Sequence, residues 1–218
     1  MPEALLFVLQ TNYSVLAGFV LSTAILAISP GPDNIFVLAQ SLAHGAKSGL
    51  AVVIGLASGC LVHTTLLALG VSEIIKRSDT LFWMIKVFGI IYLLYLAYRV
   101  YQSRAEIDLR YSTKVKRGKI RLFWTGFTMN VLNPKVTVFF LAFFPGFLFS
   151  QEINTRIQFF VLGFLFIGVT LVVFGGIAVL SGTISKFVLQ NSKIGTVLKW
   201  IQIIVFSGIA LYLLLSDK

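Results

Sequence analysis

Charged residues are scarce in this chain: Asp, Glu, Lys and Arg make up 12% of its 218 residues, which is about half the share in a soluble domain. Hydrophobic residues make up 57%, and the mean hydropathy is +0.92. Cysteine occurs once, at Cys60. This excludes an intramolecular disulfide, and the position of Cys60 in an apolar run favours a packing role. The composition therefore excludes an ordinary soluble domain and a disulfide-stabilised one.

Side chains that carry out enzyme chemistry are also rare. His44 and His63 are the two histidines, and neither belongs to a nucleophile–base, phosphate-loop or metal-hydrolase pattern. Cys60 and His63 lie three residues apart and would share a helix face, but two ligands without a further acidic or thiol group do not make a metal site. We therefore expect no enzyme activity, no cofactor and no metal. His63 remains a candidate for proton transfer, because histidine titrates near neutral pH.

Long apolar runs, in contrast, recur along the whole chain. A membrane-spanning helix needs roughly 20 apolar residues. Met1-Pro2-Glu3 bring no positive charge before the first run, so we expect that run to be retained rather than cleaved as a signal peptide. The sequence predicts one all-α integral membrane domain, residues 1–218, with six transmembrane helices and almost nothing left for a soluble domain. The six runs are Leu5–Ile28, Ser48–Val71, Leu81–Tyr101, Leu122–Phe149, Ile157–Leu180 and Leu198–Leu215.

The basic residues are unevenly distributed. They outnumber the acidic residues by 18 to 8, for a net charge of +10, and seven of the 18 lie in Arg104–Arg121. A basic block between two spans is a topology signal rather than a nucleic-acid-binding face. With six spans, eleven basic residues fall on one side of the membrane and four on the other. We expect the richer side to be cytoplasmic and both termini to lie outside.

This topology divides the domain into a first three-span half (1–102), a basic cytoplasmic loop (103–121) and a second three-span half (122–218). Two halves with three spans each have opposite orientations in the membrane. The sequence therefore predicts a pair of inverted repeats.

Two proline-containing breaks interrupt the apolar segments, at Ser29–Asn34 and at Asn130–Lys135. Irregular backbone is not viable against lipid, so each break must face protein or a wet cavity. Broken helices in corresponding places of two halves, near the bilayer midplane, indicate the substrate site of a transporter. After the first break we predict a short helix, Asp33–His44, which re-enters the membrane or begins a kinked second span. An amphipathic segment at the membrane surface is the alternative.

The polar side chains at the breaks are the candidate site. Asp33 is the one acidic residue expected near membrane depth, where an ionisable side chain is costly and points to function; an acid that meets a helix dipole is the alternative. Lys135 needs a partner, and either Asp33 or a hydrated vestibule could supply it. The amides of Asn130 and Asn133 could satisfy freed backbone groups or bind a ligand. The candidate substrate-binding residues are Pro30, Gly31, Pro32, Asp33, Asn34, Asn130, Asn133, Pro134 and Lys135, and the candidate proton-coupling residues are Asp33 and His63.

Small residues mark the expected packing faces. Glycine lets helix backbones approach closely, so helix packing is the expected role, with room for a substrate path as the alternative. Two GxxxG spacings and a less regular second set carry this pattern: Gly45, Gly49, Gly55 and Gly59, and then Gly163, Gly168, Gly175, Gly176 and Gly182.

Two segments resemble the signatures of a known family. The run SPGPDNIFVLAQSLAHGAKSGLAVVIGLASG resembles the opening signature of the LysE/RhtB family of bacterial amino-acid exporters. The run GFTMNVLNPKVTVFFLAFFPGF resembles that family's second signature, built around Asn-Pro-Lys. The basic central loop and the overall size match as well, so the resemblance covers nearly the whole chain.

The resemblance implies a multi-pass secondary transporter of the bacterial inner membrane, which exports amino acids from the cytoplasm by antiport with protons. The implied partners are an amino acid, protons and the lipid bilayer, with no nucleic acid and with a homo-oligomer left open. The functional positions that it implies are Pro30, Gly31, Pro32, Asp33, Asn34, Asn133, Pro134 and Lys135.

The chain departs from the family members that export basic amino acids. Where those tend to carry an acid in the second span and another after the Asn-Pro, this chain has Gly59 and Phe139. Fewer acids suit a neutral, dipolar substrate such as homoserine, threonine or leucine better than lysine or arginine. Two other classes stay open. A cation or metal exporter would need more intramembrane carboxylates, thiols or histidines, and a non-transporting scaffold would not need Asp33 and Lys135 in apolar runs.

Overall fold

The computed structural model describes residues 12–29, 31–72, 78–103, 117–190 and 193–215. These residues form helices joined by short connections, and no strand occurs among them, which confirms the predicted all-α class. The elements are α2 (Tyr13–Ile28), α3 (Pro32–His44), α4 (Ala46–Leu66), η1 (Leu67–Val71), α6 (Asp79–Gln102), α7 (Lys119–Val131), α8 (Pro134–Val138), η2 (Phe139–Phe143), η3 (Phe144–Phe147), α9 (Thr155–Val179), α10 (Ser181–Gln190) and α11 (Lys193–Leu215).

Six helices or helix pairs are long and apolar enough to cross a membrane. Four are unbroken: Ala46–Gly70, Asp79–Gln102, Thr155–Val179 and Gly195–Leu215. The other two are pairs bent at a break, namely α2 with α3, at 61°, and α7 with Pro134–Phe147, at 49°. With each bent pair taken as one crossing, the predicted six spans are present, and both breaks lie inside a crossing.

The first crossing consists of α2 and α3, of which α2 is the described part of the predicted run Leu5–Ile28. Helix α3 begins at Pro32, one residue before the predicted start, because proline is well suited to a first helical position. At Gly45 the chain turns back with a φ of 84°, a conformation that glycine adopts without a Cβ clash, and α4 packs along α3. Helix α4, continued to Gly70, is long and apolar enough to cross a membrane by itself, and the bent pair of α2 and α3 can be a broken span or a re-entrant loop. The role of α3 therefore stays a prediction.

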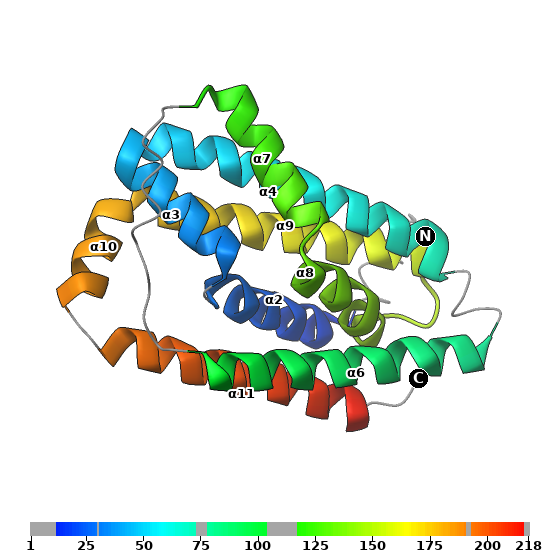
Figure 1. Cartoon of the computed structure of the whole chain (residues 1–218). Coiled ribbons are helices and arrows are strands. Elements are labelled where there is room, and N and C mark those ends of the chain that lie inside the picture. The colour runs from blue at the N-terminus through cyan, green and yellow to red at the C-terminus, as the bar shows by residue number, and fades with distance from the viewer. Residues whose placement is uncertain (1–11, 30, 73–77, 104–116, 191–192, 216–218) are drawn as a thin grey trace.

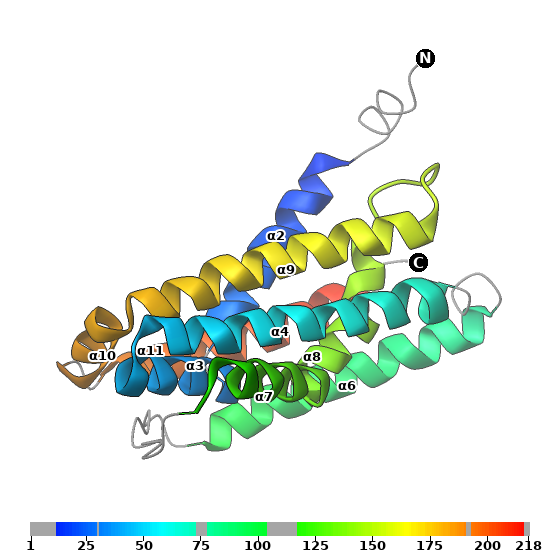
Figure 2. The ribbon, with the colours of Figure 1, turned by 90° about the horizontal axis from the view of Figure 1, so that it is seen from above.

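The helices lie side by side along one long direction (Figures 1 and 2). Helix α2 begins and α11 ends toward the right of Figure 1, whereas the α3–α4 turn, the start of α7 and helix α10 lie toward the left. The start of α2 and the end of α11 thus lie at one end of the bundle, and the start of α7 lies at the other. The sides of the membrane on which the termini and the basic loop lie stay a prediction. Of the predicted loop 103–121, residues 104–116 lie outside the described residues, and α7 already begins at Lys119.

The first helix of each bent pair packs on one of the unbroken helices from the other side of the basic loop in the sequence. Helix α7 packs along α4 and α2 packs along α9, while α4 pairs with α9 and α6 pairs with α11. An inverted repeat would produce this exchange. The contact between α4 and α7 is backbone to backbone, because a Cβ on Gly55 would overlap the carbonyl of Phe123 and a Cβ on Gly126 would overlap that of Val52. Glycine therefore holds the second break directly beside α4.

The predicted packing role of the other glycines is confirmed in part. Besides Gly55, an added Cβ would overlap a neighbouring side chain at Gly49, Gly59 and Gly163. The prediction is wrong for five glycines whose Cβ position has no neighbouring atom within 4 Å: Gly45, which forms the turn before α4, and Gly168, Gly175, Gly176 and Gly182.

A buried aromatic cluster follows the second break. Phe139, Phe140 and Phe143 of η2 and Phe144 of η3 are all buried, and the rings of Phe140 and Phe166 lie 4.9 Å apart in an edge-to-face contact. Aromatic pairs of this kind add to the stabilisation from burial. The cluster therefore fixes the chain after α8 against α9, on the other side of the break from α7.

Candidate functional site

The two breaks face each other and line one cavity of about 50 Å³, enough for several water molecules. The cavity brings together seven of the nine predicted substrate-binding residues: Gly31, Pro32, Asp33, Asn34, Asn130, Asn133 and Lys135. The eighth, Pro30, lies outside the described residues. The ninth, Pro134, is exposed at the first position of α8, where a helix needs no N–H donor.

Asn133 links the two breaks. Its Nδ2 donates to Oδ2 of Asp33 at 2.9 Å, and its Oδ1 accepts from the backbone N–H of Lys135 at 3.0 Å, which caps α8. Asp33 is 8% exposed and lies in the first turn of α3, where the helix dipole favours an acid. Asp33 therefore meets both expectations at once: it is a helix N-terminal acid, and it lies in the cavity.

Lys135 and Asp33, which both belong to the described part of the chain, do not form a direct ion pair. The sequence suggests such a pair, because no other acidic residue is expected near membrane depth. Nζ of Lys135 lies 3.5 Å from the backbone oxygens of Leu26 and Ser29 and 5.3 Å from the centre of the Phe206 ring. The C-terminal end of a helix carries the negative end of its dipole. The end of α2 and the ring of Phe206 therefore stabilise the ammonium, while Asn133 occupies the carboxylate of Asp33.

Asn34 satisfies a backbone group that the first break leaves unpaired. Its Nδ2 donates to the backbone oxygen of Ala27 at 2.7 Å, in the last turn of α2. A carbonyl at the end of a helix otherwise needs water or a cap, and the hydrocarbon region offers no water. The side chain therefore joins the two helices of the first crossing across their bend.

Asn130 connects the cavity to α4. Its Nδ2 lies 3.5 Å from Sγ of Cys60, and its backbone oxygen lies 3.3 Å from Nε2 of His63. Cys60 and His63 thus share a helix face, as predicted. Both side chains contact Asn130 near the end of α7. His63 does not line the cavity; it is buried against the ring of Phe140, at 5.2 Å between centroids. Its suggested part in proton transfer stays a prediction.

One wall of the cavity was not predicted from the sequence. Phe166, Thr170 and Phe174 of α9 line it, together with Leu56 of α4. The three α9 residues are spaced four apart, so they lie on one face of the helix. That spacing is visible in the sequence, but inside a uniformly apolar span nothing distinguishes this face from one that packs on another helix.

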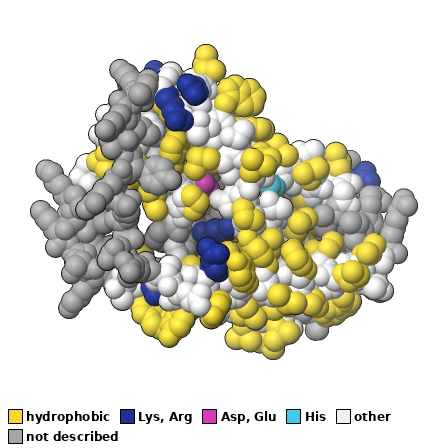
Figure 3. Space-filling model, viewed as in Figure 1, with side chains coloured by type: hydrophobic (Ala, Val, Ile, Leu, Met, Phe, Trp, Pro, Cys, Tyr) yellow, Lys and Arg dark blue, Asp and Glu magenta, His cyan; other side chains and the backbone are white. Residues whose placement is uncertain are grey.

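The charges of the site are balanced. Among the described residues that line the cavity there is one acid, Asp33, and one base, Lys135. Nowhere in the described chain do three His, Cys, Asp or Glu residues gather as metal ligands would. Figure 3 shows many hydrophobic side chains on the described part of the face, with acidic atoms visible near its centre. The site is therefore a small polar cavity with an apolar side, inside an otherwise apolar bundle.

Comparison with known proteins identifies the family of the chain. The model of the LysE-type translocators matches residues 24–217. The chain belongs to this family. The homoserine/homoserine lactone efflux protein of Salmonella typhimurium is 31% identical over 171 residues, which cover 78% of this chain and 82% of that protein. The leucine efflux protein of Salmonella choleraesuis is 27% identical over 144 residues, 66% and 68% of the two chains. No solved structure matches.

The resemblance seen in the two signatures is thus confirmed. In this LysE-type translocator, the two positions where acids were expected in exporters of basic amino acids contribute no charge. Gly59 lies against Asn130, and its missing side chain makes room for that amide. Phe139 is buried in the aromatic cluster. Asp33 is therefore the one acid among the described residues that line the cavity.

Proposed function

We propose that this LysE-type translocator exports neutral amino acids from the cytoplasm across the bacterial inner membrane in exchange for protons. The observation that carries the proposal is the cavity between the two breaks, to which Asp33 and Lys135 bring one negative and one positive group. The relatives named for the efflux of homoserine and leucine support the same substrate class.

The two ends of the cavity suit the two charged groups of an amino acid. Lys135 is held by carbonyl contacts of 3.5 Å, which are long for hydrogen bonds, and it can exchange them for a substrate carboxylate. The first turn of α3 has no side-chain cap, so its N–H groups offer further donors to that carboxylate. Asp33 and the carbonyls at the end of α2 can accept from the ammonium. A zwitterion that has shed its water finds a fixed partner for each charge.

The α9 wall suits a neutral side chain. Phe166 and Phe174 present aromatic surface, and Thr170 between them presents a hydroxyl. An apolar or hydroxyl-bearing side chain can lie against this wall. A cationic side chain would need a second acid once Asp33 is occupied by the substrate ammonium, and an unpaired buried charge costs several kcal/mol. This argument favours leucine-, threonine- or homoserine-like substrates over lysine.

Asp33 is the proposed proton carrier. When the substrate ammonium leaves, a proton on the Asp33 carboxylate would take its place and prevent an unpaired charge in the closed cavity. Antiport requires that the substrate ammonium and the proton replace each other at the same carboxylate. His63 is the proposed second proton-coupling residue, because it contacts the backbone oxygen of Asn130 at the edge of the cavity.

Efflux from proteoliposomes tests the proposal. Vesicles loaded with radiolabelled leucine, threonine, homoserine or lysine are diluted into buffer of equal or lower pH. We expect faster loss of the three neutral amino acids than from protein-free vesicles, acceleration by an acidic exterior, and loss of that acceleration on addition of a protonophore. Export of lysine alone, or of metal ions and no amino acid, would refute the substrate class. An amino-acid efflux rate that does not change with the pH gradient would refute the antiport.

A further inference from the structure

We infer that a groove between the first turns of α4 and α7 binds an anionic phospholipid. The groove is lined by Lys47, Leu50 and Ile54 from α4 and by Lys119 and Phe123 from α7, among others. It is separate from the cavity between the breaks, with which it shares no lining residue. Its two lysines and its apolar walls match the two parts of a lipid, a phosphate and an acyl chain.

The shape of the groove follows from how the two helices pack. Helices α4 and α7 begin at the same end of the bundle and run in the same direction (Figure 1). They touch backbone to backbone where Gly55 meets Phe123 and Gly126 meets Val52. Before this crossing they diverge, so the groove is open at the helix starts and closed at its inner end.

The lysines lie near the starts of the two helices, and Leu50, Ile54 and Phe123 lie further along them. Lys47, Leu50 and Ile54 are spaced by three and four residues, which places them on one face of α4. Lys47 precedes Ile54 by seven residues, so about 10 Å of helix separate the charge from that apolar side chain. A phosphate between Lys47 and Lys119 would place the first part of an acyl chain against Leu50, Ile54 and Phe123.

Charge at the mouth of the groove favours an anion. Lys47 and Lys119 are both exposed. Helices α4 and α7 begin at glycine N-caps that provide no side-chain hydrogen bond, so two positive dipole ends add to the two ammonium groups. None of the three described acidic residues lines the groove: Asp33 lies in the cavity between the breaks, Asp79 is the first residue of α6, and Glu152 precedes α9.

The surroundings point to a lipid rather than to a soluble anion. The rim of the groove is apolar and open to the outside of the bundle, with Ile54 55% exposed and Ile120 77% exposed. Trp124, next to Phe123 on α7, is also exposed, as is common where a helix meets the membrane surface. This end of the bundle also has the basic residues that predict the cytoplasmic side, and basic pockets between helices on that side suit anionic head groups.

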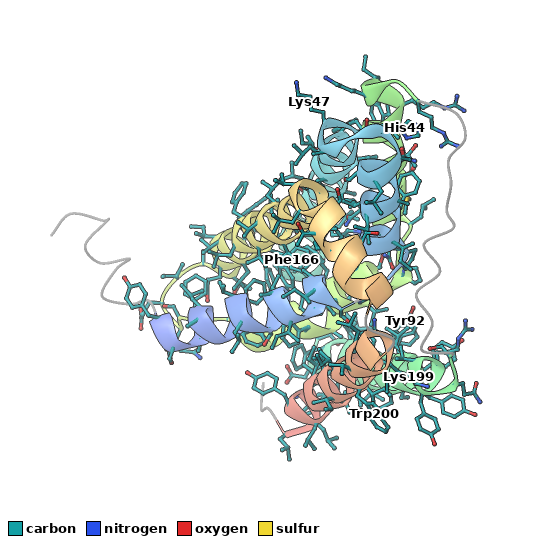
Figure 4. The ribbon with its side chains drawn as sticks, turned by 90° about the vertical axis from the view of Figure 1, so that its left-hand side faces the viewer. His44, Lys47, Tyr92, Phe166, Lys199 and Trp200 are labelled. Carbon is teal, nitrogen blue, oxygen red and sulfur yellow. The ribbon has the colours of Figure 1, made fainter. Side chains whose placement is uncertain are left out.

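Lipid binding to the purified full-length protein tests the inference. The thermal stability of the wild type in detergent is titrated with phosphatidylglycerol and, separately, with phosphatidylcholine. The variant K47Q/K119Q removes both charges of the groove. The control R99Q/K199Q removes two charges at the same end of the bundle; Figure 4 shows Lys47 and Lys199 at different sides of that end. The ratio of the two lipid affinities is compared within each variant, so differences in intrinsic stability cancel.

We expect the wild type and the control to prefer phosphatidylglycerol, and K47Q/K119Q to lose about 30-fold of that preference, as expected for two lysines near a lipid phosphate. This loss corresponds to about 2 kcal/mol. Equal affinity of the wild type for both lipids would overturn the inference, and so would an equal loss in the control. Glycerol phosphate, added as a soluble competitor, should not displace the lipid. Displacement at similar concentration would show an anion site that does not need an acyl chain.

Discussion

Replacement of Asn133 by alanine is the most direct test of the link between the two breaks. The side chain makes two interactions, a donor bond to Asp33 at 2.9 Å and an acceptor bond from the N–H of Lys135 at 3.0 Å. A hydrogen bond to a charged group contributes roughly 1.5–3 kcal/mol, and the loss of a helix N-cap costs about 1 kcal/mol. If the bond to Asp33 is needed in the rate-limiting step, N133A should transport about 10- to 150-fold more slowly than the wild type.

The chain contains a matched control for the cap. Asn154 caps α9 with the same geometry, its Oδ1 accepting from the N–H of Arg156 at 2.9 Å, and it lies outside the cavity. N154A should therefore lose the stability of a cap alone and keep its transport rate, whereas N133A should lose more thermal stability, because it also loses the bond to Asp33. Initial rates of leucine efflux from proteoliposomes, normalised to the amount of inserted protein, measure the difference. Equal rates in the two variants would refute a role for the bond between Asn133 and Asp33.

Three further outcomes are expected. Asp33→Asn and Lys135→Met should each strongly reduce the rate of amino-acid efflux. The double variant should lose less of that rate than the two single losses combined, because each single change leaves one unbalanced charge. Full additivity would show that the two charges act independently. A reporter fused to the C-terminus should be active outside the cytoplasm and one in the basic central loop inside it; a cytoplasmic C-terminus would contradict the six-span topology. Gly55→Ala should lower the melting temperature in detergent, because the added Cβ meets the backbone of α7, whereas Gly168→Ala should not; equal effects would show that the close contact is not needed.

The crossings could be predicted from the sequence because the bilayer sets their length. The predicted runs Leu81–Tyr101 and Ile157–Leu180 differ by only one or two residues at each end from α6 (Asp79–Gln102) and α9 (Thr155–Val179). Hydropathy does not show how a short apolar helix between two longer ones is connected. The turn from α3 into α4 has a φ of 84° at Gly45, and a glycine in a sequence allows that angle without requiring it.

The polar residues of the site were predictable from their cost in an apolar segment, but their pairing was not. Elimination suggested that Lys135 pairs with Asp33, since no other intramembrane acid was in view. In the structure, backbone carbonyls at the end of α2 accept from Lys135 and an amide donates to Asp33. Backbone groups freed by a break do not appear in a count of charged side chains. Helix α10 was missed for another reason, because its ten residues are too few to form a span.

The contacts between the breaks connect recognition to movement. The described structure holds the two halves together at the cavity through Asn133 to Asp33 and through Lys135 to the end of α2. A zwitterionic substrate would compete for the same groups, its carboxylate for Lys135 and its ammonium for Asp33. A ligand shifts a conformational equilibrium only by its different affinity for the two states. Because binding would replace the polar contacts that join the two breaks here, we expect the substrate to favour a state in which the breaks have moved apart, as alternating access around a fixed site would require.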